Sequence, residues 1–195
     1  MHIVISGIDG SGKGTQCQLL KYALEERGYS VQITKAYGDT EKECFAPFVQ
    51  YWDNMAITFL FQALHRQQYV HTKTALQQGK VVISDKWDDP YEAYHRQFGL
   101  LATDQSLRNT LSFLAFEGSE PDLGFVLDVP FEITEPRMRI RGKDFFDKKD
   151  ITFHQAMRNG YLAIAAERKW IVINGSKNST ITHEEILSYV LTALM

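Results

Sequence analysis

The sequence predicts an α/β fold with a five-stranded parallel sheet that helices cover on both faces. Five short apolar runs alternate with stretches of helical pattern, and they occupy residues 2–6, 30–34, 80–84, 124–129 and 170–174. Strands that alternate with helices are typical of parallel sheets, because each crossover helix packs on one face. Ligands of such sheets bind beyond the carboxyl ends of the strands, so the residues that follow each run are candidates for a site.

The helical stretches carry local start and stop signals. Helices are expected over residues 13–27, through most of the region that ends at residue 78, and over 88–98 and 103–117. The last helix is expected to begin at a capping box formed by Thr182 and Glu185. Between residues 52 and 64 apolar side chains cover more than one face, which predicts a helix packed on two sides. The second contact is either a partner subunit or a substrate pocket.

Length, charge and cysteine content restrict the class of protein. A chain of 195 residues is expected to form one domain, residues 1–195, and a net charge of −3 disfavours a general nucleic-acid surface. No run of about 18 apolar residues predicts a membrane span, and no signal peptide is expected before the first strand. Two cysteines, Cys17 and Cys44, show no metal-ligand spacing and indicate a reducing compartment. A cytoplasmic protein without a membrane or nucleic-acid partner is therefore expected.

The segment after the first strand carries the strongest motif. Residues 7–13 read G-I-D-G-S-G-K and fit the G-x-x-x-x-G-K pattern of a P-loop between a strand and a helix. Glycines let backbone N–H groups converge on phosphate oxygens, while the helix N-terminus and the lysine add positive charge. The residues expected to bind the phosphates of ATP are Gly7, Asp9, Gly10, Ser11, Gly12, Lys13, Gly14 and Thr15.

Two positions, one with a hydroxyl and one with a carboxylate, are candidate ligands for Mg²⁺. The residue after Lys13 is Gly14, and the hydroxyl comes one position later, so Thr15 is only a weak candidate ligand. Asp85 follows the third strand, where P-loop kinases place a carboxylate that organises Mg²⁺ directly or through water. The structural alternative is that Asp85 only caps the next helix.

Several longer segments resemble the thymidylate kinase family of P-loop nucleoside monophosphate kinases. They follow the family's order and spacing over nearly the whole chain and read LFQALHRQ (60–67), VVISDKWDDPYEAYHRQFG (81–99), PDLGFVLDVPFE (121–132), RMRIRGKDFFD (137–147) and YLAIA (161–165). The resemblance implies a three-layer P-loop kinase fold with a short lid at about 137–150, and a homodimer. It also implies transfer of the γ-phosphate of MgATP to a nucleoside monophosphate, with dTMP as the first expectation.

The resemblance further implies roles for individual residues. Asp9 would approach the acceptor sugar, Phe61 would stack on the acceptor base, and Lys86 would contact the acceptor or transferred phosphate. Arg141 would cover the adenine, and Arg137 would lie in or near the lid. The acceptor-binding residues expected are Asp9, Lys35, Phe61, Arg66, Lys86, Trp87 and Tyr94. The catalytic residues expected are Lys13, Asp85, Lys86, Arg137 and Arg141.

The chain departs from the family where arginines are expected to hold the acceptor phosphate. His65 replaces the arginine four residues after Phe61, with Arg66 next to it, and Lys86 replaces another arginine. A lysine is a single point charge and does not reproduce the bidentate contact of a guanidinium. The alternative is therefore a kinase of the same fold for another deoxynucleotide, a nucleoside or a small metabolite. A non-catalytic nucleotide-binding module is less favoured, because the arginine-rich lid would then have no role.

Overall fold

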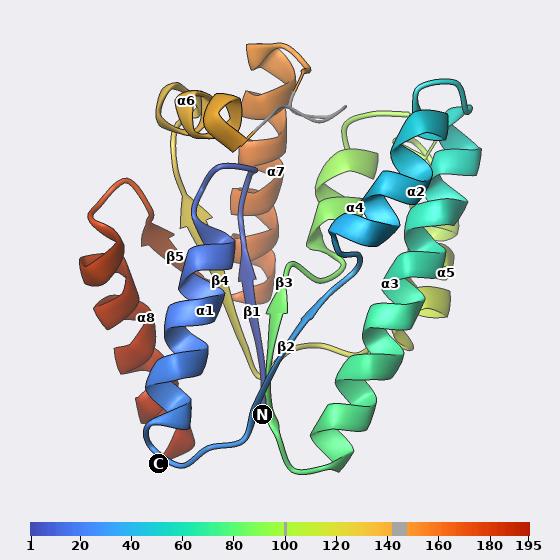
Figure 1. The fold of residues 1–195 in the computed structure, drawn as a ribbon. Coiled ribbons are helices and arrows are strands. Elements are labelled where there is room, and N and C mark those ends of the chain that lie inside the picture. Colours follow the sequence, from blue (N-terminus) through green and yellow to red (C-terminus); the bar gives the residue numbers. More distant parts are fainter. Residues whose placement is uncertain (100, 142–147) are drawn as a thin grey trace.

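The computed structural model describes residues 1–99, 101–141 and 148–195, with only the backbone described for Arg141. The elements follow the chain in this order: β1 (His2–Ser6), α1 (Lys13–Glu25), β2 (Val31–Lys35), α2 (Asp39–Val49), α3 (Asn54–Gln77), β3 (Val81–Asp85), α4 (Asp89–His95), α5 (Gln105–Phe116), β4 (Leu123–Asp128), α6 (Phe131–Arg141), α7 (Ile151–Arg168), β5 (Ile171–Asn174) and α8 (Ser179–Leu194) (Figure 1).

The five strands form one parallel sheet in the order β2-β3-β1-β4-β5. The expected parallel α/β sheet is confirmed, and the strand boundaries differ from the predicted ones by at most one residue. Strand β1 lies in the centre, between β3 and β4. The segments that follow these three strands therefore meet at one edge of the sheet.

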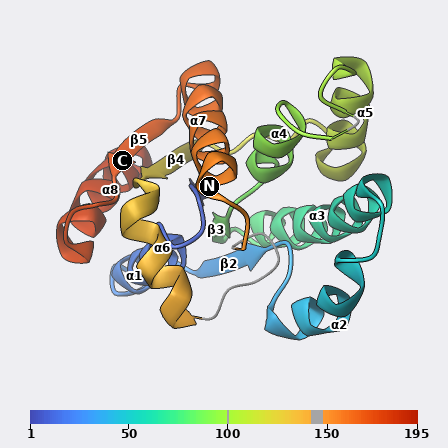
Figure 2. The same cartoon turned by 90° about the horizontal axis from the view of Figure 1, so that it is seen from above.

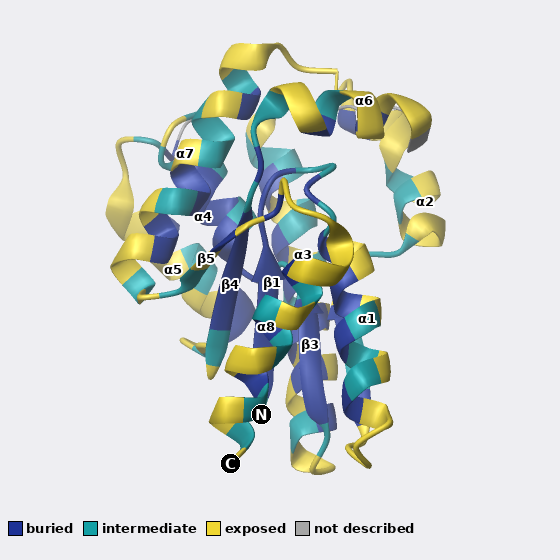
Figure 3. Cartoon of the chain, turned by 90° about the vertical axis from the view of Figure 1, so that its left-hand side faces the viewer, coloured by how far each residue is buried: buried dark blue, intermediate teal, exposed yellow. Residues whose placement is uncertain are grey.

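Helices cover both faces of the sheet, which makes three layers (Figure 1). Along β1, Ile3 and Ile5 point to the face packed by α1 and α8, while Val4 points to the opposite face beside residues of α3 and α5. Strands β1, β3 and β4 are buried between the helices, which expose their outer sides (Figure 3). Seen from above, α6 lies on the α1 side of the strand ends and α2 lies next to the first turns of α3 (Figure 2).

Two helix boundaries differ from the sequence expectation. The region before Gln77 contains two helices, because Asp53 caps a new helix by accepting hydrogen bonds from the backbone N–H groups of Met55 and Ala56 at 2.8 and 2.9 Å. The last helix starts at Ser179 with Asn178 as its N-cap. Thr182 therefore lies inside α8, and the predicted capping box is wrong.

The arginine-rich segment is only partly described. Its first residues, from 137 to 141, form the last turns of helix α6, and residues 142–147 lie outside the described residues. The single domain and the lid over 137–150 stay predictions.

Candidate active site

The P-loop joins β1 to α1 with a backbone that requires glycine. Gly10 has a φ of 79°, and a Cβ atom there would lie 2.7 Å from the carbonyl oxygen of Thr134. Positive φ and this close approach both exclude larger residues. The Lys13 ammonium donates a hydrogen bond to the carbonyl oxygen of Ile8 at 2.9 Å, so the lysine folds back over its own loop. This geometry suits a phosphate group held between loop amides and a lysine.

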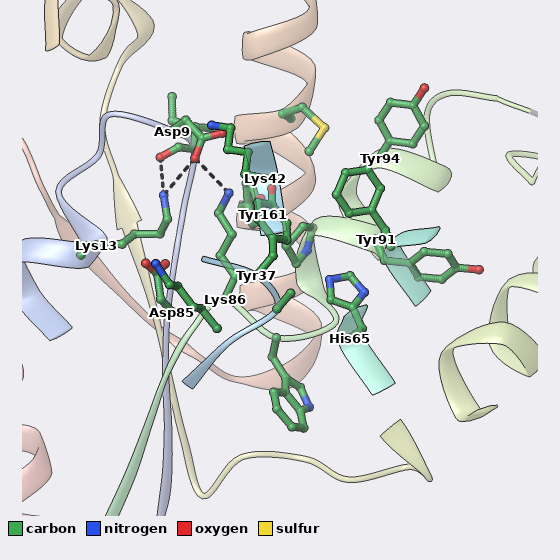
Figure 4. Close-up of a pocket in the computed structure, with 18 of the residues that line it drawn as sticks. Asp9, Lys13, Tyr37, Lys42, His65, Asp85, Lys86, Tyr91, Tyr94 and Tyr161 are labelled. Atoms are coloured by element: carbon green, nitrogen blue, oxygen red, sulfur yellow. Dashed lines mark hydrogen bonds and ion pairs between the residues drawn. The ribbon is translucent and has the colours of Figure 1, made fainter. Parts of the chain in front are cut away.

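Asp9 lies between two lysines at the mouth of the loop (Figure 4). Its Oδ1 is 3.0 Å from the Lys86 ammonium and 3.6 Å from the Lys13 ammonium. Burial by itself lowers the pKa of Lys86, but Asp9, together with Tyr161 and Tyr37, outweighs it, and the pKa ends well above its ordinary value. Lys86 therefore stays protonated, and the Asp9 carboxylate lies between two positive charges at the loop end of the cavity.

Asp85 ends β3 directly beside the first turn of α1. A Cβ atom on Gly14 would lie 3.9 Å from Asp85 Oδ2, and the exposed Thr15 lines the same cavity. Within the described ranges, no group of three or more His, Cys, Asp or Glu side chains is arranged to hold a metal ion. Mg²⁺ at kinase sites is commonly bound by one or two carboxylates together with substrate phosphates. The donor set of Asp85 and Thr15 fits such an ion.

A cavity of about 650 Å³ extends from the P-loop to α3 and α4. Its far end is lined by aromatic rings, among them Phe61, Tyr91 and Tyr94, and Tyr37 lies between these rings and Lys86 (Figure 4). Phe61 makes a tilted contact with Tyr37 and an edge contact with Phe45, each at 5.8 Å between ring centroids. The cavity thus combines a charged end with a flat, apolar end.

Two histidines at the aromatic end are neutral. Burial lowers the pKa of His65 to about 4 and that of His95 to about 4. One ring nitrogen of each has a neutral partner: His65 Nδ1 lies 3.2 Å from Gln62 Oε1, and His95 Nε2 lies 3.2 Å from the Thr58 hydroxyl. The aromatic end therefore offers hydrogen-bonding groups without a net charge.

The cavity brings together most of the residues expected from the sequence. Those that line it are Asp9, Gly10, Gly12, Lys13, Gly14, Thr15, Lys35, Phe61, Asp85, Lys86, Trp87, Tyr94 and Arg137. Gly7 and Ser11 belong to the loop but are not among the lining residues. Arg137 donates a hydrogen bond to the carbonyl oxygen of Gly10 at 3.1 Å, which places α6 over the loop. The side chain of Arg141, which was expected to cover the adenine, lies outside the described part of the structure.

Two expected acceptor residues need correction. Arg66 does not line the cavity: its guanidinium pairs with the exposed Glu117 at 2.8 Å and lies over the Tyr69 ring. Trp87 borders the cavity, but its side chain is fully buried. Its indole N–H donates a hydrogen bond to the carbonyl oxygen of Ser119 at 3.1 Å and is not available to a ligand. Neither geometry supports a contact with an acceptor.

Lining residues that the sequence did not single out include Lys42 on α2 and Gln68 on α3. Lys42 lies between the Asp9 end and the aromatic end in Figure 4. No motif marks either residue. Only their place on the inner side of a helix, combined with the position of the P-loop, could have indicated them.

A phosphate-binding loop with its lysine, a carboxylate at the end of the neighbouring strand and an adjoining aromatic cavity define a P-loop nucleotide kinase. Comparison with known proteins specifies the family. The sequence model for thymidylate kinase matches residues 5–186. The chain is 32% identical to a thymidylate kinase of Sulfurihydrogenibium sp. over 95% of this chain and 94% of the relative.

Further relatives agree over the full length. The chain is 32% identical to a thymidylate kinase of Halothermothrix orenii, and the match covers 100% of this chain and 98% of the relative. It is 33% identical to one of Geotalea uraniireducens, with 98% and 97% covered. The chain belongs to the thymidylate kinase family. None of the helices in the described ranges is long and apolar enough to cross a membrane.

Proposed function

We propose that this protein transfers the γ-phosphate of ATP to dTMP and so produces dTDP. The observation that carries this proposal is a continuous cavity of about 650 Å³, with the P-loop at one end and aromatic side chains at the other. This volume lies within the usual range for sites that bind small molecules. A donor phosphate at the loop and a flat acceptor base at the wall would bring the two phosphates together near Asp9 and Lys86.

The donor half of the site consists of the loop and α6. The loop amides and the Lys13 ammonium bind the β- and γ-phosphates, while Arg137, which lies over Gly10, adds positive charge. From the family resemblance we propose that Arg141 covers the adenine and that residues 137–150 act as the lid. Closure of such a lid would exclude water and limit wasteful hydrolysis of ATP.

Magnesium is the proposed metal. Asp85 would hold it directly or through water, and Thr15 is the second candidate, since both line the cavity beside the loop. When bound, Mg²⁺ neutralises developing charge on the transferring phosphate. Asp85 provides the carboxylate that would position the ion.

The acceptor half needs no general base. The phosphate of a nucleoside monophosphate is already an anionic nucleophile, so alignment and charge neutralisation are sufficient. Lys35 and Lys86 would bind the acceptor phosphate, Asp9 would contact the sugar, and Phe61 with Tyr94 would hold the base. All five of these residues line the cavity.

The test is ADP formation from MgATP with dTMP, dUMP, the other nucleoside monophosphates and thymidine offered one at a time. A Lys13→Ala variant controls for contaminating kinases. Turnover that depends on dTMP supports the proposal. Turnover only with a different acceptor, or none while ATP still binds, contradicts it.

A second candidate is a kinase of the same fold that prefers another acceptor. The specific observation in its favour is that Arg66 points away from the cavity and pairs with Glu117. Lys86 then supplies a point charge where the family uses an arginine, and Lys35 is a further lysine that lines the cavity. The same acceptor series separates the two candidates, because the highest kcat/KM identifies the substrate.

We also propose that two copies associate through the face formed by α3 and α5. Phe59 on α3 exposes 56% of its surface, and Phe113 and Leu114 on α5 expose 61% and 63%. A cluster of exposed apolar side chains marks a protein interface, and the family resemblance favours a homodimer. Light scattering after size exclusion should give the mass of two chains, and Leu114→Glu should give that of one. A wild-type protein with the mass of one chain would refute this.

A reducing compartment such as the cytoplasm is the proposed location. Both Cys17 and Cys44 are free thiols, and Cys44 is exposed. Free exposed thiols are typical of proteins kept in reducing surroundings. Fractionation of the native cells tests this, and recovery with secreted or membrane proteins would contradict it.

A further inference from the structure

Lys86 has a backbone conformation that is unusual for a lysine. Its φ is 67°, in the left-handed region that residues with a side chain seldom adopt. Among the described residues, two other non-glycine residues have positive φ, Glu117 and Lys169, and both directly follow the end of a helix. A left-handed residue is common at that position. Lys86 instead follows a strand and lines the cavity, so its conformation needs another explanation.

Three hydrogen bonds hold the turn at Lys86. Its backbone N–H donates to the carbonyl oxygen of Ile5 at 3.1 Å, and the N–H of Trp87 donates to Asp89 Oδ1 at 2.8 Å. The third bond comes from α3: Gln68 Nε2 donates to the carbonyl oxygen of Lys86 at 2.9 Å. Gln68 is only 1% exposed, so water does not compete for this contact.

This conformation determines where the side chain goes. With the turn held in place, the Lys86 ammonium lies 3.0 Å from Asp9 Oδ1, next to the lysine of the P-loop (Figure 4). Without the Gln68 amide, the carbonyl of Lys86 would lose this partner, and the two remaining bonds would hold the turn less firmly against relaxation toward negative φ. The side chain would then turn away from Asp9.

We infer that Gln68 is a positioning residue, which holds Lys86 in the left-handed conformation that aims its ammonium at the Asp9 end of the cavity. The functional part of this inference rests on the proposed kinase activity, in which Lys86 touches a phosphate. The same helix carries Phe61 and His65, which line the aromatic end. Helix α3 therefore sets the position of the acceptor wall and that of a phosphate-binding lysine together.

A double-mutant cycle tests the inference. Gln68→Leu keeps the approximate size of the side chain and removes the hydrogen-bond donor. The kcat of phosphate transfer to the acceptor should fall about ten- to a hundredfold. The KM for ATP should stay within about twofold, because Lys13 keeps its contacts with the loop. In a Lys86→Ala background the same substitution should have almost no further effect, since the side chain that it positions is gone.

A matched control is available one helical turn further along α3. The hydroxyl of Thr72 is also buried and lies 3.0 Å from Thr34 on β2, with no contact to Lys86 among the described residues. Thr72→Val should leave kcat unchanged, although it disturbs a buried contact between α3 and the sheet. Thermal unfolding of each variant shows whether the fold is retained.

The crystal structure of Gln68→Leu provides a readout that does not depend on activity. We expect Lys86 to leave the left-handed region and its ammonium to move away from Asp9. The inference is overturned if Lys86 keeps its conformation in that structure, or if Gln68→Leu lowers kcat by the same factor with and without the Lys86 side chain. If the wild-type protein phosphorylates no acceptor, the proposed function fails, and the crystal structure still decides the positioning.

Discussion

Replacing His2 with phenylalanine is expected to make the protein less sensitive to acid. His2 is buried in β1, where its Nε2 lies 2.8 Å from the Ser84 hydroxyl and its ring packs edge-on against Trp87 at 4.6 Å between centroids. Phenylalanine has a similar shape and does not titrate. Ser84 keeps a second partner in Thr34 at 2.9 Å, so the cost of the substitution at pH 8 should be only about 1 kcal/mol.

The size of the effect follows from the pKa of His2. Burial lowers this pKa from 6.5 to about 4, and it outweighs the opposing attraction of Asp122. The unfolded chain therefore binds the proton first. The contribution of neutral His2 to the free energy of unfolding is fully present above about pH 6.5 and is lost as the pH falls toward 4. The complete loss amounts to about 3 kcal/mol, of which about 2 kcal/mol has occurred at pH 5.

Urea unfolding at pH 8 and pH 5, followed by tryptophan fluorescence, measures this loss. The difference in the free energy of unfolding between wild type and His2→Phe should shift by about 2 kcal/mol in favour of the variant at pH 5. His65 and His95 are present in both proteins, so their contributions cancel. A difference that is the same at both pH values would refute the reasoning, because it would mean that His2 takes up no proton on unfolding.

Three further predictions concern the site. Gly10→Ala should weaken ATP binding more than tenfold by calorimetry, because the added Cβ would lie 2.7 Å from the carbonyl oxygen of Thr134. Gly12→Ala is the control, because a Cβ there meets open space and adds only the strain of a positive φ. Equal losses of affinity in the two variants would contradict this. Arg66→Ala should change kcat/KM for the acceptor less than about twofold in steady-state assays, since the guanidinium lies outside the cavity. A larger loss would restore Arg66 to the acceptor site. Asp85→Asn should raise the concentration of free Mg²⁺ needed for half-maximal rate at least about tenfold, and an unchanged requirement would remove Asp85 from the metal site.

Local sequence patterns determined the P-loop and the sheet. The loop could be predicted because its function depends on glycines and a lysine at fixed spacing between a strand and a helix, all within 13 consecutive residues, 2–14. The strands could be predicted because β-branched runs in a parallel sheet are buried on both faces. The family resemblance rests on further short segments between residues 60 and 165, which follow the family's order and spacing.

Neighbouring residues on α3 show where local pattern was insufficient. His65 lines the cavity, while Arg66, the residue expected to contact the acceptor, pairs with Glu117 on the outside. Successive residues of a helix point about 100° apart, so a small rotation of the helix decides which of two neighbours faces the ligand. That rotation is set by how α3 packs on the sheet and on α5.

The sequence by itself determined the fold class, the P-loop and the family of this protein, because each depends on short local patterns and on their order along the chain. Only the tertiary structure decided that Trp87 belongs to the core and that Gln68 reaches the carbonyl of Lys86. Burial and hydrogen bonding between residues far apart in the chain depend on the packing of whole elements, and no local pattern encodes them.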